Sequence, residues 1–450
     1  MERQHAVVVG ASIGGLLAAR VLSEHFERVT ILERDALPGG PEVRKAVPQG
    51  AHVHVLLPGG SEVLAALFPG FHDTLRAAGA VETDVASRLA WYQFGVWKMR
   101  RSVGLSMWQL TRPLLEWSLR TRVTALDNVA LRTGTRVGAL LATTDGGRVI
   151  GVRVATGDLD AEELRADLVV DASGRGSRAP EWLSGLGRPR VEEDEIRMWL
   201  GYSSRFFRRT KDPGWNAAYV IATPPAHRAG LLFAVEGGRW LCTLSSWLRD
   251  YPPTDEAAFM AFARDLPVSE LHEAIRDAEP LGEIHSHRFA CSVRRRFEKL
   301  RMPEGFVVLG DALSSFSPIY GQGMTVSALE AQALRACLRE TSGVTARFQR
   351  SAARIVDGAW LLAASEDLRY PEVEGARPPL LGVLHRYVER AHRLAGRDDV
   401  VLRRLCEVLA MAAPPTVLFR PATAVRILAR RPAPRAQEGR DLPAHRLPAR

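Results

Sequence analysis

The first residues of the chain alternate between short apolar runs and glycine-rich breaks. Residues 6–9 form a β-branched run that stops at Gly10, a pattern that predicts a buried parallel strand. Apolar residues at helical spacing then predict a helix over 13–25. Residues 28–33 are again apolar and β-branched, so they predict a second strand. This order predicts a strand–helix–strand unit at the start of the chain.

After the first 35 residues, the spacing of apolar residues alternates between that of strands and that of helices. Three strand-like runs fall at 129–137, 148–156 and 166–172, and further strand-like stretches with two short helices occupy 195–290. A buried strand at 305–309, a helix over 324–338 and mostly helical residues 343–430 follow. The pattern predicts an α/β fold. It has a discontinuous Rossmann-like domain (1–90, 108–190, 291–360), an interleaved antiparallel-sheet domain that binds substrate (91–107, 191–290), a helical C-terminal region (361–430) and a disordered tail (431–450).

Composition narrows the class of partner. The chain is 46% hydrophobic and 25% charged, which is ordinary for a soluble globular protein. Its net charge is +9, yet only four of its 60 basic residues are lysine: Lys45, Lys98, Lys211 and Lys299. This arginine bias is typical of a GC-rich genome, and no basic face is interleaved with aromatic residues. We therefore predict no nucleic-acid partner.

Four cysteines, Cys242, Cys291, Cys337 and Cys406, lie far apart with no C-x-x-C pair. This spacing predicts neither a zinc site nor a disulfide framework, and we expect free thiols in a reducing cytoplasm and no metal. No run of 18 or more apolar residues occurs, so no integral membrane span is predicted. The apolar start is not taken as a signal peptide, because its glycines fall at motif spacing.

The first motif is Gly10-Ala11-Ser12-Ile13-Gly14-Gly15, a G-x-G-x-x-G frame with Ser12 at the middle position. Gly10 allows a tight turn, the small Ser12 lets a pyrophosphate approach the backbone, and Gly15 lets the helix lie against the strand. Glu33, 23 residues after Gly10, ends the second strand and can accept hydrogen bonds from a ribose diol. Gly14 and Arg34, which follows Glu33, complete the contacts predicted here. The acid repels a 2′-phosphate, which favours FAD or NAD over NADP.

A second strand-to-loop element separates FAD from NAD. A buried strand ends at Gly310-Asp311, and the chain continues through Pro318, Gly321 and Gly323 to a helix that begins near Met324. The Asp311 carboxylate can bind a ribityl hydroxyl, and the helix N-terminus can face an isoalloxazine edge. An NAD enzyme has no need of this element, so we predict FAD.

These residues resemble the para-hydroxybenzoate hydroxylase-like FAD-dependent monooxygenases. The late Gly310-Asp311, Pro318, Gly321 and Gly323 are similar to that family's Gly-Asp motif. The segment from Asp171 to Arg178 approaches its middle motif, which bridges the cofactor and substrate regions. Arg44 and Arg112 match arginines that lie near the flavin or its phosphates in the family. The resemblance therefore adds Arg44, Arg112 and Asp171 to the predicted cofactor contacts.

A narrower likeness runs from residue 5 to about residue 365. Residues 44–49 (RKAVPQ), with His52 and His54 after them, resemble bacterial polyketide epoxidases, as do residues 236–240 and 318–324. Ala46 replaces the glycine of that subfamily, Gln322 stands where it often has His, and Thr325 stands where the wider family has Asn. These departures concern the substrate more than the cofactor.

The resemblance implies an enzyme that inserts one oxygen atom from O₂ into an olefinic or aromatic natural-product intermediate through a flavin C4a-hydroperoxide. Because no base that could deprotonate a phenol is identifiable, epoxidation is favoured over aromatic hydroxylation. A flavin-dependent reductase or halogenase-like enzyme is a second alternative, although the halogenase W-x-W-x-I-P signature is absent. A non-catalytic FAD-binding module is a third. Electrons would come from NAD(P)H or from a partner flavin reductase, because no second nucleotide motif is present.

Single residues leave alternatives open. Tyr320 either positions a small apolar substrate or packs under the flavin ring. His52 and His54 are expected to be hydrogen-bonded loop histidines near the cofactor rather than metal ligands. For the aromatic group Trp91, Tyr92, Phe94, Trp97 and Trp108, core packing is the simpler expectation, but some members can line a large apolar pocket.

Overall fold

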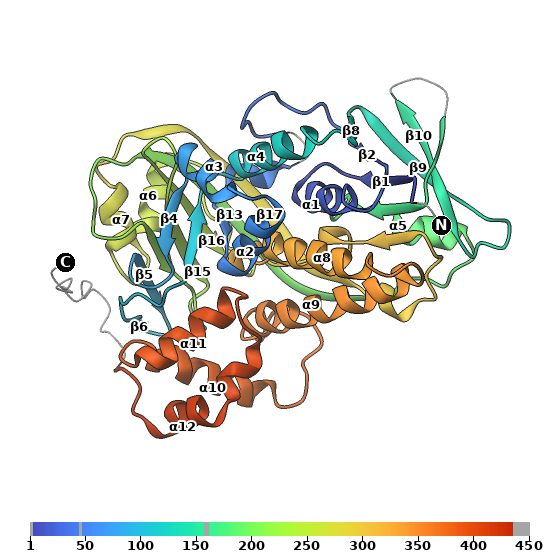
Figure 1. Ribbon diagram of the computed structural model, residues 1–450. Coiled ribbons are helices and arrows are strands. Elements are labelled where there is room, and N and C mark those ends of the chain that lie inside the picture. Colours follow the sequence, from blue (N-terminus) through green and yellow to red (C-terminus); the bar gives the residue numbers. More distant parts are fainter. Residues whose placement is uncertain (1–2, 45–46, 157–161, 435–450) are drawn as a thin grey trace.

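The computed structural model describes residues 3–44, 47–156 and 162–434 (Figure 1). Lys45 and Ala46 of the epoxidase-like stretch, and residues 435–450 of the predicted tail, lie outside the described residues. The fold is α/β, with a Rossmann-like domain, an interleaved antiparallel-sheet domain and a helical C-terminal region. The predicted fold class is therefore confirmed.

A five-stranded parallel sheet forms the first domain. The predicted strand–helix–strand unit is present as β1 (His5–Val9), α1 (Ile13–Leu22) and β2 (Arg28–Leu32). The strand order is β18-β12-β1-β2-β8, with β18 (Phe306–Val308), β12 (Leu168–Asp171) and β8 (Val129–Arg132) completing the sheet. Two glycine motifs some 300 residues apart thus follow strands of one sheet, and both lie at its carboxyl edge, where α/β folds bind ligands.

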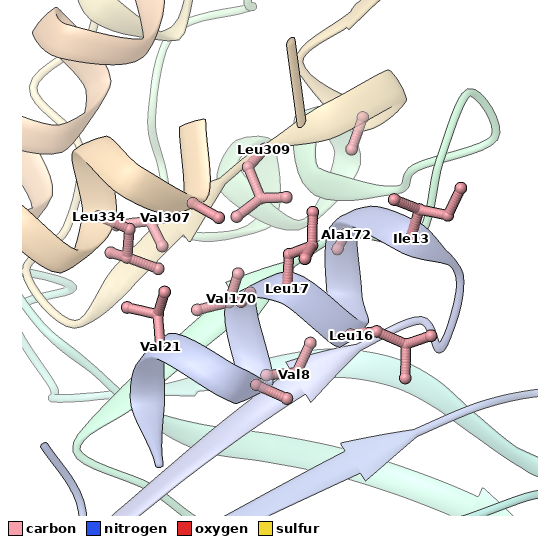
Figure 2. Packing of buried hydrophobic residues seen from close by; sticks show 14 of the residues in the cluster. Val8, Ile13, Leu16, Leu17, Val21, Val170, Ala172, Val307, Leu309 and Leu334 are labelled. Carbon is pink, nitrogen blue, oxygen red and sulfur yellow. The ribbon is translucent and has the colours of Figure 1, made fainter. Parts of the chain in front are cut away.

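Helix α1 is packed between this sheet and α8 (Gly323–Cys337). Figure 2 shows Val8 and Val170 of the sheet, Leu17 and Val21 of α1 and Leu334 of α8 in one apolar layer. All five side chains are fully buried. Because each such residue stabilises the fold by about 1.5–3 kcal/mol, the layer fixes both helix N-termini relative to the sheet.

The segment 129–172, for which three strand-like runs were predicted, holds five strands, so the predicted number was wrong. The run at 129–137 is broken at Gly134, whose φ of +64° turns the chain between β8 and β9 (Thr135–Ala142). Strand β9 joins β10 (Val149–Thr156) and β11 (Glu162–Arg165) in a separate three-stranded antiparallel sheet. Apolar alternation continues across a tight turn, which is why one run was predicted.

The second domain is built on an eight-stranded sheet that is antiparallel except for the parallel pair β14–β5. Its order is β19 (Ser314–Ser315), β17 (Pro280–Arg295), β13 (Glu193–Arg208), β16 (Arg239–Ser246), β15 (Arg228–Val235), β14 (Ala217–Val220), β5 (Leu89–Gln93) and β6 (Val96–Trp97). Strand β19 lies just after the Gly-Asp motif of the parallel sheet. The two domains therefore meet at this motif.

Smaller elements join these layers. A three-stranded sheet is formed by β3 (Val55–Leu56), β7 (Ser106–Gln109) and β4 (Val81–Asp84). Residues 58–77 form two helices, α2 (Pro58–Leu67) and α3 (Phe71–Ala77), which Pro69 and Gly70 separate. The remaining helices before residue 280 are α4 (Arg112–Thr124), α5 (Ala179–Gly185), α6 (Glu256–Arg264) and α7 (Glu270–Ile275).

The C-terminal region is helical, with α9 (Val344–Asp367), α10 (Leu381–Leu394), α11 (Asp399–Leu409) and α12 (Pro421–Ala429). Figure 1 shows α10, α11 and α12 gathered beside β5 and β6 of the eight-stranded sheet. Leu402 and Leu405 of α11 share an apolar cluster with Leu89 and Trp91 of β5. The region thus covers one face of that sheet. Within the described residues, no helix has both the length and the apolar character that crossing a bilayer requires.

Candidate functional site

A cavity of about 990 Å³ lies where the parallel sheet, the eight-stranded sheet and the C-terminal helices meet. Gly10, Glu33 and Asp311 all line it. Three stretches that are remote along the chain therefore converge on one continuous cavity, as the motifs require if they bind a single dinucleotide.

The glycine-rich turn needs its glycines for space. Gly10 has a φ of +102°, and a Cβ atom there would lie 2.5 Å from the carbonyl oxygen of Ala172. A Cβ atom on Gly15 would lie 1.8 Å from the carbonyl oxygen of Gly10. Ser12, Ile13 and Gly14 line the cavity at the N-terminus of α1, where backbone N–H groups have no partner within the helix. Such an end binds phosphate groups.

Buried charged side chains hold this part of the cavity together. Arg44 forms ion pairs with Glu33 at 3.0 Å and with Glu116 at 2.8 Å. The Ser12 hydroxyl donates to Glu116 Oε2 at 2.7 Å and accepts from Arg112 at 3.0 Å. We call these five residues, Ser12, Glu33, Arg44, Arg112 and Glu116, the motif wall; all but Glu116 line the cavity. Each charge in the motif wall has a charged or hydrogen-bonded partner, which is how proteins tolerate buried ions.

Glu33 stays ionised in this setting. Burial by itself raises the pKa of the carboxyl, but hydrogen bonds from the backbone N–H groups of Ala11 and Asp35, together with Arg44, outweigh burial and hold the pKa below its usual range. Ala11 N donates to Oε2 at 2.9 Å and Asp35 N to Oε1 at 3.0 Å. A carboxylate has about four acceptor positions, so Glu33 can still receive a hydroxyl.

The late Gly-Asp motif lines the cavity next to the start of α8. The N–H of Gly310 donates to Glu330 Oε2 at 2.6 Å, and burial raises the pKa of Glu330 to about 8. Among the described residues, the Asp311 carboxyl has no hydrogen-bond partner, and burial raises its pKa although Arg112 and Arg175 oppose the rise. Buried polar oxygens of Ser315, Ser317 and Gln322 also lack partners and come from residues that line the same cavity.

These unpaired polar groups show whether the cavity could bind a flavin cofactor. Buried hydroxyl, amide and carboxyl groups without partners are costly unless a ligand or water satisfies them. A ribityl chain and a pyrophosphate supply hydroxyls and anionic oxygens that match them. The residues present therefore fit a flavin dinucleotide.

Most of the residues predicted from the sequence line this cavity. They are Gly10, Ser12, Gly14, Glu33, Arg34, Arg44, Arg112, Gly310, Asp311, Pro318, Tyr320, Gly321, Gly323 and Met324. Gly15 and Asp171 do not. Asp171 is fully buried, and its carboxyl accepts from Ser173 N at 2.9 Å and from the Ser177 hydroxyl at 2.5 Å. Because its carboxylate oxygens accept hydrogen bonds from residues 173 and 177, Asp171 stabilises the loop behind the cavity.

The opposite part of the cavity is apolar and aromatic. Tyr219 stacks on Phe233 with ring centroids 5.4 Å apart, and Trp91 contacts Tyr219 and His392 edge-on at 6.5 and 5.5 Å. We call Trp91, Tyr219, Phe233 and His392 the aromatic wall. Of the aromatic group predicted from the sequence, Trp91 lines the cavity, whereas Tyr92 and Trp97 pack in one core cluster and Trp108 in another. Core packing was thus the right expectation for those three.

The two loop histidines lie between these walls. His52 Nδ1 is 2.7 Å from the Ser204 hydroxyl, and His54 Nδ1 is 3.0 Å from the His52 carbonyl oxygen. Burial lowers the pKa of each to about 3, so both imidazoles are neutral. The prediction of hydrogen-bonded loop histidines is confirmed. No cluster of metal-ligating side chains occurs in the part of the chain that the structure describes.

A pair formed by the half-buried Tyr320 and the buried Asp367 closes the wall next to α8. Tyr320 lines the cavity, and its hydroxyl donates to Asp367 Oδ1 at 2.8 Å. The Trp247 indole N–H donates to the same oxygen at 3.0 Å, while Asp367 Oδ2 is buried without a partner among the described residues. Burial raises the pKa of Asp367 to about 7, and Glu366 adds to the rise against the two hydrogen bonds.

Three carboxyl groups of the site were missed from the sequence. Glu116 lies four residues after Arg112 in α4, and that spacing on one helical face could have identified it. Glu330 lies seven residues after Gly323 in α8, two turns along the same face. Asp367 is at the end of α9, 47 positions from Tyr320, and no local pattern signals their contact.

Comparison with known proteins agrees with this geometry. Residues 6–180 match the model of a family described as FAD dependent oxidoreductase. The chain is 34% identical over 395 residues to the Mycobacterium tuberculosis protein Rv3254, which covers 82% of this chain and 81% of the relative. The chain belongs to the FAD-dependent oxidoreductases. FAD is thus the cofactor of its family.

More distant proteins share the fold. A kynurenine 3-monooxygenase from Salinispora arenicola is 25% identical over 432 residues, covering 90% of this chain and 84% of that protein. The flavin-dependent brominase Bmp2 superposes with a TM-score of 0.65 at 15% identity, covering 94% of this chain and 97% of Bmp2. At that identity the likeness to Bmp2 concerns the fold of this oxidoreductase alone.

Proposed function

We propose that this oxidoreductase is an FAD-dependent monooxygenase that transfers one oxygen atom of O₂ to an olefinic or aromatic natural-product intermediate. The observation that carries the proposal is the single cavity bounded by the motif wall on one side and the aromatic wall on the other. In the proposal, the discontinuous Rossmann-like domain (1–90, 108–190, 291–360) binds FAD. The interleaved domain (91–107, 191–290) binds substrate, and the helical region (361–430) closes the cavity.

The residues that would hold FAD divide by chemistry. The N-terminus of α1, from Ser12 to Gly14, would bind the pyrophosphate, and the free acceptor position of Glu33 would bind a ribose hydroxyl. Asp311 would bind the ribityl chain, and the N-terminus of α8 at Gly323 and Met324 would lie at the ring edge, where negative charge collects on reduction. When bound and reduced, FAD supplies the activation of O₂.

The protein's own part is to bind, orient and keep water out. The aromatic wall offers large apolar side chains with few polar atoms, which suits an apolar substrate. Water exclusion matters in an oxygenase because activated oxygen that is not transferred is lost in side reactions. The neutral His52 and His54 add hydrogen-bonding capacity to the cavity without adding a buried charge.

Epoxidation is the first candidate reaction, because the stretch at 44–54 resembles polyketide epoxidases. Aromatic hydroxylation is the second, and the kynurenine 3-monooxygenase among the relatives favours it. Electrons would come from NAD(P)H or a partner flavin reductase. Since Cys242, Cys291, Cys337 and Cys406 are all buried free thiols, we place the enzyme in the cytoplasm as part of the same proposal.

The decisive experiment follows the oxygen atom. The FAD-loaded protein is supplied with reductant and ¹⁸O₂ and incubated with candidate polyenes and phenols, and the products are analysed by mass spectrometry. One labelled oxygen atom per product is expected. Dehydrogenation without label would indicate a flavin-dependent reductase, and brominated product in the presence of bromide would indicate a halogenase. A purified protein that cannot be loaded with FAD would contradict the proposal altogether.

A further inference from the structure

Tyr320 and Asp367 form a hydrogen-bonded pair that extends from the cavity lining into the core. Tyr320 belongs to the turn Pro318–Tyr320, directly before the glycines that begin α8, and it lines the cavity. Asp367 ends α9, is fully buried and does not itself line the cavity. A substrate bound in the cavity therefore meets Tyr320, whose hydroxyl in turn contacts this carboxyl.

The hydrogen bond of this pair has a direction. Tyr320 donates its proton to Asp367, so the lone pairs of the tyrosine oxygen are left to accept a hydrogen bond from a substrate hydroxyl. Burial raises the pKa of Tyr320 well above its usual range, and the neighbouring Asp367 and Glu366 add to this, so Tyr320 remains a donor. A tyrosine held in this way passes a proton on without ionising itself.

The carboxyl is built to take up a proton near neutrality. Both donors, Tyr320 and Trp247, converge on Asp367 Oδ1, and the buried Oδ2 has no partner among the described residues. A permanently ionised carboxylate at this depth would need donors on both oxygens.

The charged and titratable groups around Asp367 are accounted for. Glu366 lines the cavity, but its carboxylate accepts two hydrogen bonds from Arg369, each at 2.9 Å. The Tyr370 hydroxyl donates to the Ala226 carbonyl oxygen at 2.8 Å. Of these groups, Asp367 is the one with a buried oxygen, Oδ2, that has no partner among the described residues. Its pKa of about 7 fits that arrangement.

Resting on the proposed function, we propose that Tyr320 and Asp367 together accept the proton of a substrate hydroxyl, and that the substrate carries an acidic hydroxyl such as that of a phenol or enol. In the step, the substrate O–H bond breaks and its proton passes to the Tyr320 oxygen. The Tyr320 proton passes to Asp367 Oδ1, and the substrate keeps the electron pair as an electron-rich oxyanion. Tyr320 is the catalytic residue and Asp367 a positioning residue that acts through it. A simple alkene has no proton for this path.

Three bicyclic probes of similar size separate the possibilities: 2-naphthol, its methyl ether 2-methoxynaphthalene, and the alkene 1,2-dihydronaphthalene. The FAD-loaded protein is photoreduced, mixed with each probe and ¹⁸O₂, and the labelled product of a single turnover is followed by mass spectrometry. We expect labelled product from 2-naphthol, with a rate that rises with pH and levels above about pH 7, because the base must be ionised.

Variants test the path itself. Asp367→Asn keeps the shape of the side chain but cannot take up the proton, so the 2-naphthol rate should fall about 100-fold and lose its rise with pH. The 2-naphthol rate of Tyr320→Phe should fall by a similar factor. Trp247→Phe removes a hydrogen bond that lowers the pKa of Asp367, so the rise should move to higher pH, a shift that a purely structural role would not produce. The control Glu372→Gln makes the same acid-to-amide change five residues after Asp367, at an exposed carboxyl, and should leave rate and pH profile unchanged.

Each outcome decides something. Equal labelling of 2-methoxynaphthalene and 2-naphthol, or a pH profile that survives in Asp367→Asn, would overturn the proton path. Label in 1,2-dihydronaphthalene alone would also overturn it and leave the monooxygenase standing. No label in any probe would count against the proposed function. Infrared difference spectra of the oxidised protein then test the carboxyl without turnover. A protonated-carboxyl band that titrates near pH 7 and is missing in Asp367→Asn supports the path, and its absence from the unmodified protein contradicts it.

Discussion

The motif wall and the aromatic wall border the same cavity but treat buried charge in opposite ways. In the motif wall, Arg44 is paired with both Glu33 and Glu116, and Ser12 links Glu116 to Arg112. Behind the aromatic wall, the fully buried Lys98 donates to the Gln93 carbonyl oxygen at 3.0 Å and lies 5.4 Å from the Trp91 ring, and it forms no ion pair among the described residues. The ion pairs of the motif wall hold its side chains in one arrangement. The unpaired, buried Lys98 instead makes the stability of the protein depend on pH.

Removing Arg44 should have the largest effect. In Arg44→Met, the buried carboxylates of Glu33 and Glu116 lose their shared cation, so we expect the free energy of unfolding to fall by about 3–5 kcal/mol, with loss of bound FAD. Urea unfolding and flavin absorbance measure both. The backbone N–H groups of Ala11 and Asp35, together with Arg44, hold the pKa of Glu33 below its ordinary 4.5. Because the variant loses the Arg44 part of this effect, the difference from the unmodified protein should shrink as pH falls below that value. The control is Arg34→Met, whose side chain is 59% exposed and should change stability little.

Substitution of Gly15 should have the second-largest effect, because a side chain there would collide with backbone atoms, which cannot move aside as a side chain can. A Cβ atom in Gly15→Ala would lie 1.8 Å from the Gly10 carbonyl oxygen, and α1 would have to move. We expect a loss of about 3 kcal/mol, seen as a lower Tm, and a protein largely free of FAD. Gly176→Ala has no atom within 4 Å of the new Cβ and is the matched control. An FAD-loaded Gly15→Ala of unchanged Tm would mean that the motif wall tolerates a shift of its helix.

Asp311 tests the cofactor contact without disturbing packing. Since its carboxyl has no protein partner among the described residues, Asp311→Asn should leave Tm of the FAD-free protein nearly unchanged. The affinity for FAD should fall by about 2 kcal/mol, roughly 30-fold, because a charge-assisted hydrogen bond is lost. Flavin fluorescence titration measures the change. An unchanged affinity would move the ribityl chain away from Asp311.

Lys98 offers a test of the unpaired buried charge, and here the expected change in stability per pH unit is the smallest of the four effects. Burial lowers the pKa of Lys98 well below its ordinary 10.5, so between the folded pKa and 10.5 the unfolded chain binds the extra proton. Relative to Lys98→Met, the unmodified protein should therefore gain about 1.4 kcal/mol of stability per pH unit as pH rises through that window. Denaturant unfolding at several pH values measures the difference. Parallel curves for the two proteins would show that Lys98 is not buried as a lone amine.

Local sequence pattern was enough to predict the glycine turns and the acid that line one side of the cavity. The glycines at 10, 14 and 15, the acid at 33 and the Gly-Asp pair at 310 are each dictated by the turn or strand end they occupy, so spacing along the chain was enough to predict them. The fold class and the parallel strand–helix–strand unit followed for the same reason. Glu116 was within reach of the same reasoning, because it lies one helical turn from Arg112.

The aromatic wall and the Tyr320–Asp367 pair, by contrast, were decided by tertiary structure. Nothing near Asp367 in the sequence indicates that α9 brings it to Tyr320 and Trp247, and the absence of a visible base had favoured epoxidation. Likewise Trp91 faces the cavity while Tyr92, beside it, packs in the core, because side chains on a strand alternate between faces. Glycines and capping acids serve their own turn, so sequence specifies them. A buried carboxyl acquires its chemistry from whatever elements close around it, and only the folded chain determines which elements those are.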